Sequence, residues 1–259
     1  MMKRKSKFGL RDMGKAWQDK EVLDKIVPVV PHFSIEPEKS ALLVMDMNYV
    51  CAHRDYGIGL KFPTIGLRPD YFYDRIDSTV IPSIQKLLAQ FRESRLPVLF
   101  TAMGTQRQDL SDLPETWRKT YPRIGYDKSR PGTKEYEIRE EVKPLLGEPV
   151  LMKRTSGAFA STDIQQRLEG WGAKTLIITG VETDCCVYNT AIEANDRGYQ
   201  VIVVEDATTT LTHTGHKLFL EAYGAIFFFN VRTTEQVLAE VQASLSQRPQ
   251  APVPVAKAR

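Results

Sequence analysis

Cysteine is scarce in this sequence, with three among 259 residues, and two of the three, Cys185 and Cys186, are adjacent. Adjacent cysteines and one distant partner, Cys51, cannot form the set of bridges that stabilises small secreted domains. The sequence therefore predicts reduced thiols in a reducing compartment, and we expect a cytoplasmic protein.

Long apolar runs and an excess of one charge are also missing. No stretch approaches the roughly 18 apolar residues of a membrane span, and the basic start MMKRKSKFGLRDMGK leads into no apolar signal-peptide core. The 35 basic side chains are nearly balanced by 32 acidic ones, for a formal charge of +3, and no basic stripe is visible. We therefore expect neither a membrane nor a nucleic acid as partner.

Apolar residues make up 42% of the chain, which is enough for the core of one large α/β domain. They gather in runs of strand length bounded by polar or glycine residues, and continuous runs of this kind are typical of strands buried on both faces of a parallel sheet. The runs are Ala41–Met47, Pro97–Ala102, Pro149–Lys153, Thr175–Gly180, Val201–Glu205 and Ala225–Val231.

Segments with the apolar spacing of a helix alternate with these runs. Gly198 and Gly224 each follow such a segment, where a left-handed residue commonly ends a helix. The alternation predicts a doubly wound α/β domain with a mostly parallel six-stranded sheet, helices on both faces and strand order 3-2-1-4-5-6. The predicted helices are Thr79–Arg95, Lys134–Leu146, Thr162–Leu168, Asp184–Arg197, His216–Tyr223 and Thr234–Leu245.

The chain divides into three parts. Residues 1–38 lack periodicity and predict an arm wrapped on the domain or on a second subunit, residues 39–246 form the domain, and the proline- and alanine-rich residues 247–259 predict a disordered tail. Within the domain, the long stretches 51–77 and 104–131 each follow the carboxyl end of a strand. Ligands bind at that edge of such sheets, so we expect both stretches to be loops that enclose a substrate.

Three chemically useful side chains follow strands at this same edge. Asp46 ends the first strand, Lys153 ends the third, and the Cys185–Cys186 pair opens a helix after the fourth. A helix N-terminus and an ammonium both favour a thiolate, lowering a cysteine pKa from about 8.5. A carboxylate can take the thiol proton, and nearby backbone N–H groups can hold an oxyanion.

Each residue also has a simpler interpretation. An aspartate at a strand end often caps a turn, a strand-end lysine is usually solvated, and a cysteine early in a helix is usually a small buried apolar residue. The coincidence of all three at one edge favours catalysis, but does not choose between Cys185 and Cys186. On this interpretation, substitution of Asp46 or Lys153 should alter chemistry more than folding.

Three ordered stretches of the sequence resemble the isochorismatase-like cysteine hydrolases: ALLVMDM, then KRTSGAFASTDIQQRL, then TLIITGVETDCCVYNTAIEANDRGYQVIVVEDA. The resemblance spans residues 40–245. It implies a catalytic triad of Asp46, Lys153 and Cys186, because Cys186 and not Cys185 fits the family pattern G-x-x-T-x-x-C-V. It also implies a homodimer or homotetramer.

The family pattern further implies a cis peptide bond between Val181 and Glu182. The backbone amides of Glu182 and Cys186 would then form the oxyanion hole. The side chains expected to contact the substrate are Asn48, Gln106, Phe159 and Tyr188. From their place in the two inserted stretches, the arginines and aromatic residues there, Tyr121 among them, are further candidates, although arginines in polar loops are usually only solvated.

Two departures from the family bear on the substrate. Asn48 stands where many members have a longer glutamine, and the segment FTAMGTQRQDLSDLP lacks the histidines with which the nicotinamidase branch binds a metal. His213 and His216 have a suitable i, i+3 spacing, but no third ligand accompanies them, which favours a loop or surface role. We therefore expect neither a metal nor a cofactor.

The segment DLSDLP is similar to the branch that hydrolyses ureido and carbamoyl compounds, including biuret, ureidoacrylate and N-carbamoylsarcosine. The resemblance thus implies a hydrolase that cleaves a C–N bond of a small amide, ureido or carbamoyl compound through a thioester, releasing ammonia or an amine. Three alternatives remain: a nicotinamidase-like amidase, a vinyl-ether hydrolase, whose known members lack the cysteine, and a non-catalytic binding protein.

Overall fold

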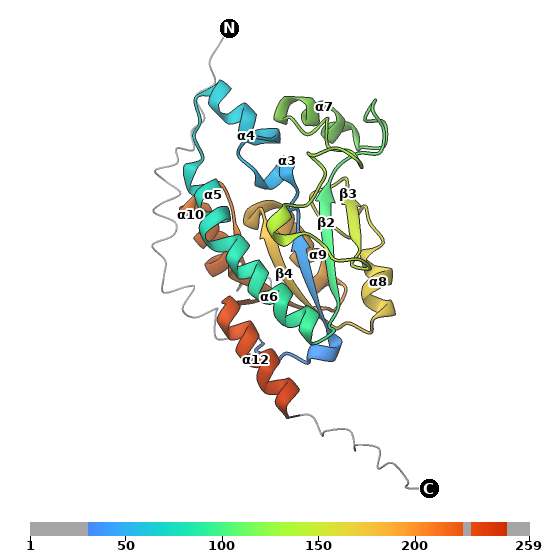
Figure 1. Cartoon of the computed structure of the whole chain (residues 1–259), viewed down its shortest axis with the longest axis vertical. Helices are drawn as coiled ribbons and strands as arrows, with labels where there is room; N and C mark the ends of the chain where they lie inside the picture. The colour runs from blue at the N-terminus through green and yellow to red at the C-terminus, as the bar shows by residue number, and fades with distance from the viewer. Residues whose placement is uncertain (1–30, 225–228, 248–259) are drawn as a thin grey trace, which may run out of the picture.

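The computed structural model describes residues 31–224 and 229–247. Within them, six strands form a parallel sheet in the order β3-β2-β1-β4-β5-β6, which confirms the predicted topology (Figure 1). The strands are β1 (Ser40–Met45), β2 (Val98–Met103), β3 (Val150–Lys153), β4 (Thr175–Val181), β5 (Gln200–Thr209) and β6 (Asn230–Arg232).

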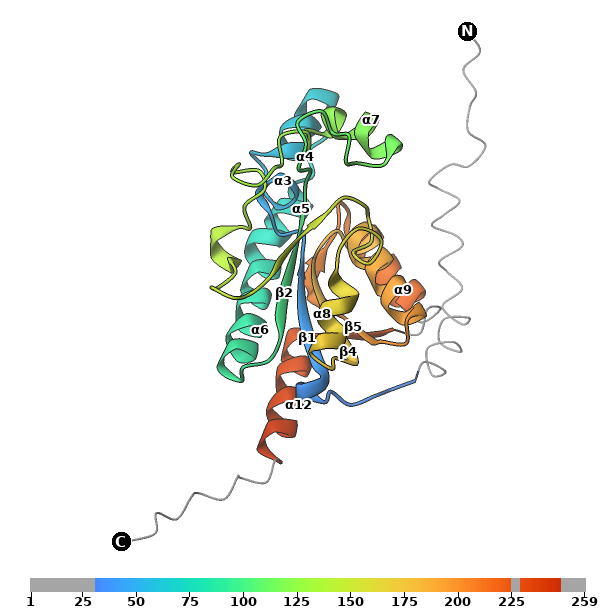
Figure 2. The ribbon, with the colours of Figure 1, turned by 90° about the vertical axis from the view of Figure 1, so that its right-hand side faces the viewer.

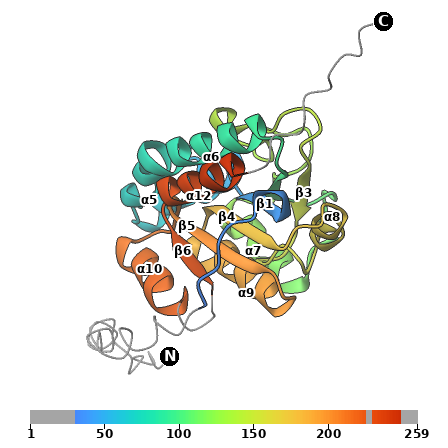
Figure 3. The same ribbon diagram turned by 90° about the horizontal axis from the view of Figure 1, so that it is seen from below.

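Helices cover both faces of this sheet. On one face lie α5 (Asp70–Arg75), α6 (Ile81–Glu93) and α12 (Thr234–Ser246), and on the other lie α8 (Ile164–Gly170) and α9 (Tyr188–Asp196) (Figures 2 and 3). Burial on both sides explains the uninterrupted apolar runs, because alternate residues of one strand enter different cores. In β1, Val44 packs on the α6 side and Leu43 on the opposite side.

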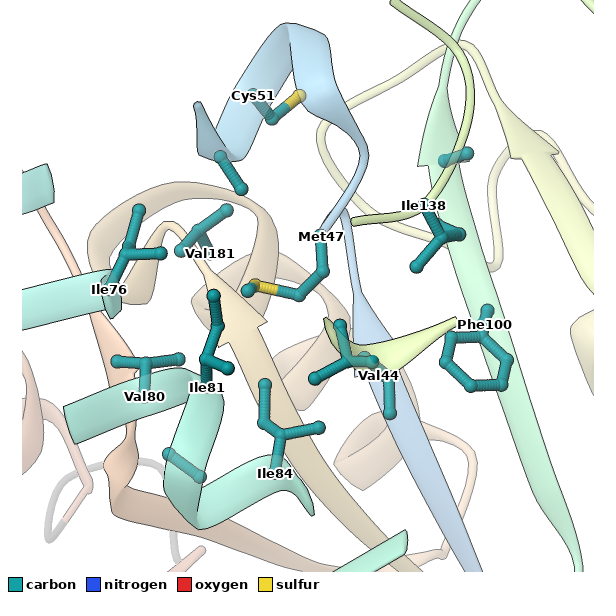
Figure 4. Packing of buried hydrophobic residues seen from close by; sticks show 14 of the residues in the cluster. Val44, Met47, Cys51, Ile76, Val80, Ile81, Ile84, Phe100, Ile138 and Val181 are labelled. Carbon is teal, nitrogen blue, oxygen red and sulfur yellow. The ribbon is translucent and has the colours of Figure 1, made fainter. Parts of the chain in front are cut away.

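The core between α6 and the sheet surrounds the strand ends that carry the candidate site. Ile81 and Ile84 of α6 face Val44 of β1, Phe100 of β2 and Val181 of β4 (Figure 4). All five are buried. Since full burial of such a side chain stabilises a fold by about 1.5–3 kcal/mol, this contact holds the strand ends rigidly.

The two inserted stretches contain short helices, where the sequence predicted loops. The first holds the end of α3 (Tyr49–Ala52), α4 (Gly57–Lys61) and α5, and the second holds α7 (Glu115–Ile124). α3, α4 and α7 lie beyond the carboxyl ends of the strands, over the predicted ligand edge (Figures 1 and 2). None of the helices that the structure describes has the length and apolarity needed to cross a bilayer.

The predicted helix Lys134–Leu146 is wrong. Ile138 forms an antiparallel bridge with Asn48, and a 3-10 turn at Glu140–Val142 is the only helical geometry in this segment. The backbone groups here bond to another part of the chain: Tyr49 N–H donates to Glu137 O at 2.9 Å, and Arg139 N–H donates to Met47 O at 2.8 Å. Groups used in this way are not available for i to i−4 bonds.

Of the two predicted left-handed glycines, one is confirmed and one is wrong. Gly198 has φ 85°. Gly224 has φ −55°, in the right-handed region, and a Cβ there would lie 3.1 Å from Cε2 of Phe229. Gly224 therefore serves close packing and not a turn.

The end of the predicted N-terminal arm packs on the domain. Asn230 Nδ2 donates to Pro31 O at 3.0 Å, and Arg232 donates to Phe33 O, so this part of the chain runs beside β6. Residues 1–30 of the arm, residues 225–228 of the sixth predicted strand and residues 248–259 of the tail lie outside the described residues.

Candidate active site

The three predicted catalytic residues lie at the carboxyl edge of the sheet. Asp46 follows β1 with φ 49°, a left-handed conformation that aspartate tolerates better than most residues. Lys153 is the last residue of β3, and Cys186 lies in the π-helical turn η6 (Thr183–Val187) between β4 and α9. Asp46, Lys153 and Cys186 are 1%, 0% and 9% exposed, so the sheet brings all three together almost out of contact with water.

Lys153 Nζ is the centre of this group. It lies 2.9 Å from Asp46 Oδ2 and 3.3 Å from Cys186 Sγ. It also donates to the carbonyl oxygens of Thr155 at 2.7 Å and Ser156 at 3.0 Å, which fix the ammonium in place. One cation thus touches both the candidate base and the candidate nucleophile.

Asp46 is held by Thr101 of the neighbouring strand β2. Thr101 Oγ1 donates to Asp46 Oδ1 at 2.8 Å, and Asp46 N–H donates to Thr101 O at 3.1 Å. Oδ2 accepts no hydrogen bond from the described residues and has the ion-pair contact with Lys153. One oxygen is therefore anchored while the other remains a proton acceptor. Sequence reasoning missed Thr101, although a hydroxyl in an otherwise apolar strand was its signal.

The ionisation of the site corrects one expectation. Burial disfavours the charge of Lys153, but the Asp46 carboxylate and the Cys186 sulfur outweigh it and raise the pKa of Lys153. A hydrogen bond with Cys185, followed by burial, raises the pKa of the Cys186 thiol, opposite to the lowering that the sequence predicted. That same bond lowers the pKa of Cys185, so ionisation does not select the nucleophile; contact with Lys153 favours Cys186.

A family model for the isochorismatase domain matches residues 40–236, which is most of the chain. The chain belongs to the isochorismatase family. The solved structure of a cysteine hydrolase from Pseudomonas syringae superposes with a TM-score of 0.68 at 21% identity, covering 83% of this chain and 98% of the other, and so shares the fold.

Curated relatives match shorter parts of this isochorismatase-family chain. Nicotinamidase 3 of Arabidopsis thaliana is 36% identical over 131 residues, covering 50% of this chain and 63% of the relative. Ureidoacrylate amidohydrolase RutB of Serratia proteamaculans is 26% identical over 185 residues, covering 66% and 70%. The first two curated relatives are matched over 57% and 65% of their own length.

The peptide bond between Val181 and Glu182 is cis, at the position that the family resemblance implied. After it the chain folds back, because Cys185 N–H and Val187 N–H both donate to Glu182 O at 3.1 Å. Cys186 lies between these two donors in the sequence. The use of the Glu182 and Cys186 amides as an oxyanion hole stays a prediction.

The Glu182 side chain also belongs to this region, although the sequence analysis considered only its amide. It is half-buried. Burial, and then the neighbouring Cys185, Asp184 and Asp46, raise the pKa of Glu182 to about 8. A carboxyl group with a pKa of about 8 therefore lies directly before η6, the nucleophile turn that carries Cys186.

Two of the predicted substrate contacts, Asn48 and Gln106, lie in different surroundings. Asn48 is fully buried, and its Nδ2 donates to Met103 O at 3.0 Å and to Glu135 O at 3.3 Å; among the described residues its Oδ1 has no hydrogen-bond partner. Gln106 is exposed, and its backbone N–H donates to Asp112 at 2.9 Å. Their contact with substrate stays a prediction.

The other two, Phe159 and Tyr188, are half-buried; Tyr188 is the first residue of α9, and Phe159 packs against that helix. Phe159 N–H donates to Glu193 Oε2 at 3.0 Å, and its ring lies 5.9 Å from that of Tyr199. The Tyr188 ring meets Phe219 edge-on at 5.1 Å. These contacts show how the rings are held, and substrate contact stays a prediction for both.

Tyr121 of α7 is fully buried, and its hydroxyl group has no hydrogen-bond partner in the part of the chain that the structure describes. Burial raises its pKa, and Cys51, Asp46 and Cys186 contribute to the same shift, which places this tyrosine near the triad. Its ring packs edge-on against Trp117 at 5.9 Å and Tyr126 at 5.6 Å, so the second inserted stretch is held by an aromatic cluster.

No cluster of three or more histidine, cysteine, aspartate or glutamate side chains suited to a metal occurs among residues 31–224 and 229–247. The exposed His213 packs its ring edge-on against Tyr71 at 5.7 Å. His216 is buried and uses both ring nitrogens in contacts with Arg75 and Thr183. The surface role predicted for this pair is wrong for His216.

Proposed function

We propose that this protein is a cysteine hydrolase that cleaves a C–N bond of a small ureido or carbamoyl compound through a thioester-type intermediate on Cys186. The observation that carries the proposal is the position of Lys153 Nζ, 2.9 Å from Asp46 Oδ2 and 3.3 Å from Cys186 Sγ, in a site from which water is almost excluded. In such surroundings a fixed cation stabilises developing negative charge strongly.

In the first half of the reaction, Asp46 removes the proton from Cys186 as sulfur attacks the carbonyl carbon. The raised pKa of the Cys186 thiol increases the need for this base. The C–S bond forms, and the carbonyl electrons move to oxygen, which the Glu182 and Cys186 amides would receive. Collapse of this intermediate breaks the C–N bond, and protonated Asp46 gives its proton to the leaving nitrogen.

In the second half, water replaces the amine. Asp46, again a carboxylate, removes a proton from water as the water oxygen attacks the acyl carbon. The C–S bond then breaks, and Asp46 gives this proton to the departing sulfur, which restores the Cys186 thiol and the Asp46 carboxylate. Lys153 keeps its proton throughout, since the pKa of this ammonium is raised by the Asp46 carboxylate in spite of burial. Its role is to stabilise charge on carboxylate and sulfur.

The substrate class rests on resemblance more than on geometry. The DLSDLP segment is similar to the ureido branch, and the matched ureidoacrylate amidohydrolase belongs to that chemistry. In the structure the side chains of this segment make local hydrogen bonds. Asp112 accepts from Thr105 Oγ1 and Gln106 N–H, and Asp109 accepts from Ser111 N–H at 3.1 Å. The 36% identity with a nicotinamidase makes an aromatic amide the second candidate.

A panel of small compounds tests the proposal by ammonia release. It contains ureido and carbamoyl compounds, nicotinamide, pyrazinamide and a simple aliphatic amide. A vinyl ether is included as well, and its hydrolysis is measured from its own product because it releases no ammonia. We expect the highest kcat/KM for a ureido or carbamoyl compound. Preference for an aromatic or aliphatic amide would overturn the substrate class, and turnover of none or of the vinyl ether would overturn the C–N hydrolase assignment.

Metal removal gives a second test. The segment after β2 contains no histidine, so the chain lacks the ligands that its resemblance assigns to a metal-binding branch. We expect dialysis against a strong chelator to leave the ammonia-release rate unchanged. A lost rate that zinc, iron or manganese restores would contradict this expectation.

A further inference from the structure

The turn that carries Cys186 is held by a chain of hydrogen bonds outside the triad. Thr183 Oγ1 lies 2.9 Å from His216 Nδ1, and His216 Nε2 lies 3.1 Å from a terminal nitrogen of Arg75. Thr183 and His216 are each 2% exposed. The chain links three elements: η6, α10 (His213–Leu218) and the end of α5, and the last two lie side by side in Figure 1.

Arg75 decides which ring nitrogen of His216 carries the proton. A guanidinium group has only donors, so His216 Nε2 accepts in its contact with Arg75; the Glu205 carbonyl, which could otherwise take a proton from the ring, accepts from Arg75 at 3.1 Å. In a neutral ring the proton then lies on Nδ1, which donates to Thr183 Oγ1. The ring is neutral at pH 7, because burial and then the charge of Arg75 lower the pKa of His216 to about 4.

Arg75 is itself fixed to β5. Its Nε donates to Thr208 O at 3.4 Å, and a terminal nitrogen donates to Glu205 O at 3.1 Å. The residue after Thr183 is fixed to the same strand end, since Thr210 Oγ1 donates to Asp184 Oδ1 at 2.5 Å. Two consecutive residues of the turn are therefore anchored, Thr183 to a side chain of α10 and Asp184 to the side chain of Thr210, the residue after β5.

These anchored residues lie between the two groups that the proposed reaction uses. Thr183 follows Glu182, whose amide is a candidate oxyanion donor, and Cys186 lies three residues further on. A shift of the turn would move the amide and the thiol relative to Asp46 and Lys153, which are held by β1 and β3. Small misplacements of this kind lower rates strongly.

We propose that Arg75 and His216 are positioning residues: Arg75 sets the His216 tautomer, and the resulting Nδ1–H bond to Thr183 fixes the nucleophile turn. The role of this device in turnover rests on the proposed function. The tautomer and the placement of the Cys186 thiol do not, and can be measured without any substrate.

Two substitutions of His216 separate its two contacts. In His216→Asn the amide nitrogen falls near the position of Nδ1 and keeps a donor for Thr183. In His216→Gln the amide oxygen falls near Nε2, keeps the acceptor for Arg75 and loses the donor to Thr183. Thr183→Val removes the acceptor at nearly constant volume, and Thr183→Ser retains it.

With a substrate from the panel, we expect His216→Gln and Thr183→Val to lower kcat by about tenfold or more at little-changed KM, as loss of positioning does. His216→Asn and Thr183→Ser should keep most of kcat. The double variant His216→Gln/Thr183→Val should be no worse than either single one, because both break the same bond. Equal losses in the Asn and Gln variants, or fully additive losses, would overturn the proposal.

Substrate-independent measurements complete the test. Nitrogen-15 NMR of His216 should show protonated Nδ1 and unprotonated Nε2 at pH 7, and Arg75→Met should admit the other tautomer. Iodoacetamide should alkylate Cys186 more slowly in His216→Gln and Thr183→Val than in His216→Asn. A wild-type Nε2–H tautomer, or one alkylation rate for all three variants, would overturn the inference, whereas a wild-type protein without hydrolase activity would overturn only the proposed function.

Discussion

The Asp46–Lys153 ion pair is almost wholly buried, with side chains 1% and 0% exposed. Removing one member of such a pair leaves an uncompensated charge, and replacing both members by neutral groups removes that penalty. The burial therefore adds an effect on folding to the effect on chemistry that the sequence predicted for substitutions here. The reacting groups also carry part of the stability of the sheet edge.

We expect Lys153→Met to lower the free energy of unfolding by about 3 kcal/mol or more, because the Asp46 carboxylate stays behind without its cation. The double variant Asp46→Asn/Lys153→Met should recover most of this loss. Lys153→Met and the double variant should each lower kcat by orders of magnitude, since Asp46 acts as the base and Lys153 as the stabilising cation in the proposed reaction. Urea unfolding checks the order of stability, and a single variant as stable as wild type would contradict it.

His216 gives the protein a specific pH dependence. Burial and Arg75 lower its pKa from 6.5 to about 4, so between these values the unfolded chain binds a proton that the folded chain does not. The free energy of unfolding therefore falls as the pH drops from 6.5 towards 4. From pH 7 to pH 5 wild type should lose about 2 kcal/mol more than His216→Gln.

The matched control for this prediction is His213→Gln, because His213 is exposed on the same helix. It should keep the wild-type pH dependence of urea unfolding. Equal slopes for His216→Gln and wild type would show that the ring does not remain neutral in the fold.

At the scale of elements, β1 and β4 meet unusually closely just before the site. Gly180 of β4 has φ 97°, and a Cβ on it would lie 2.0 Å from Met45 O of β1. Glycine is required at position 180 for two reasons: its positive φ, and the lack of space for a Cβ. Asp46 and the cis peptide follow directly on the two strands, so this contact sets the distance between base and nucleophile turn.

We expect Gly180→Ala to destabilise the protein much more than Gly198→Ala. Gly198 also has positive φ, at 85°, but nothing lies within 4 Å of its added Cβ, so alanine there costs only the conformational term of about 1–2 kcal/mol. Gly180→Ala adds a clash with backbone that cannot relax without separating the strands. Urea unfolding of the two variants measures the difference, and similar losses would contradict the packing argument.

The sequence predicted long elements better than short ones, for a physical reason. Helices that bury one face over several turns leave a periodic pattern, as α6 and α12 do, and strands buried on both faces leave continuous apolar runs. Helices of four or five residues, such as α3 and α4, are too short to show a period. The segment 134–146 shows one without being helical, because its backbone bonds to residues 47–50.

At the scale of the whole molecule, the sheet topology predicted the location of the site better than any single motif did. A parallel sheet in the order 3-2-1-4-5-6 places Asp46, Lys153 and the cysteine turn at one edge, and this was predictable from where each strand ends. The thiol pKa was not, since it depends on the Cys185 contact and on burial. The positions of His216 and Tyr121 depend on packing between segments far apart in the chain, which no local pattern encodes. The homodimer or homotetramer stays a prediction.

The central claim is that Cys186, and not its neighbour Cys185, forms the covalent intermediate. The most direct measurement is intact-protein mass spectrometry after rapid quenching with the best ammonia-releasing substrate, on Cys185→Ala and Cys186→Ala. Cys185→Ala should show the mass of the acyl group and keep a substantial part of kcat. Cys186→Ala should show neither adduct nor turnover. An adduct and turnover that survive in Cys186→Ala and vanish in Cys185→Ala would contradict the account.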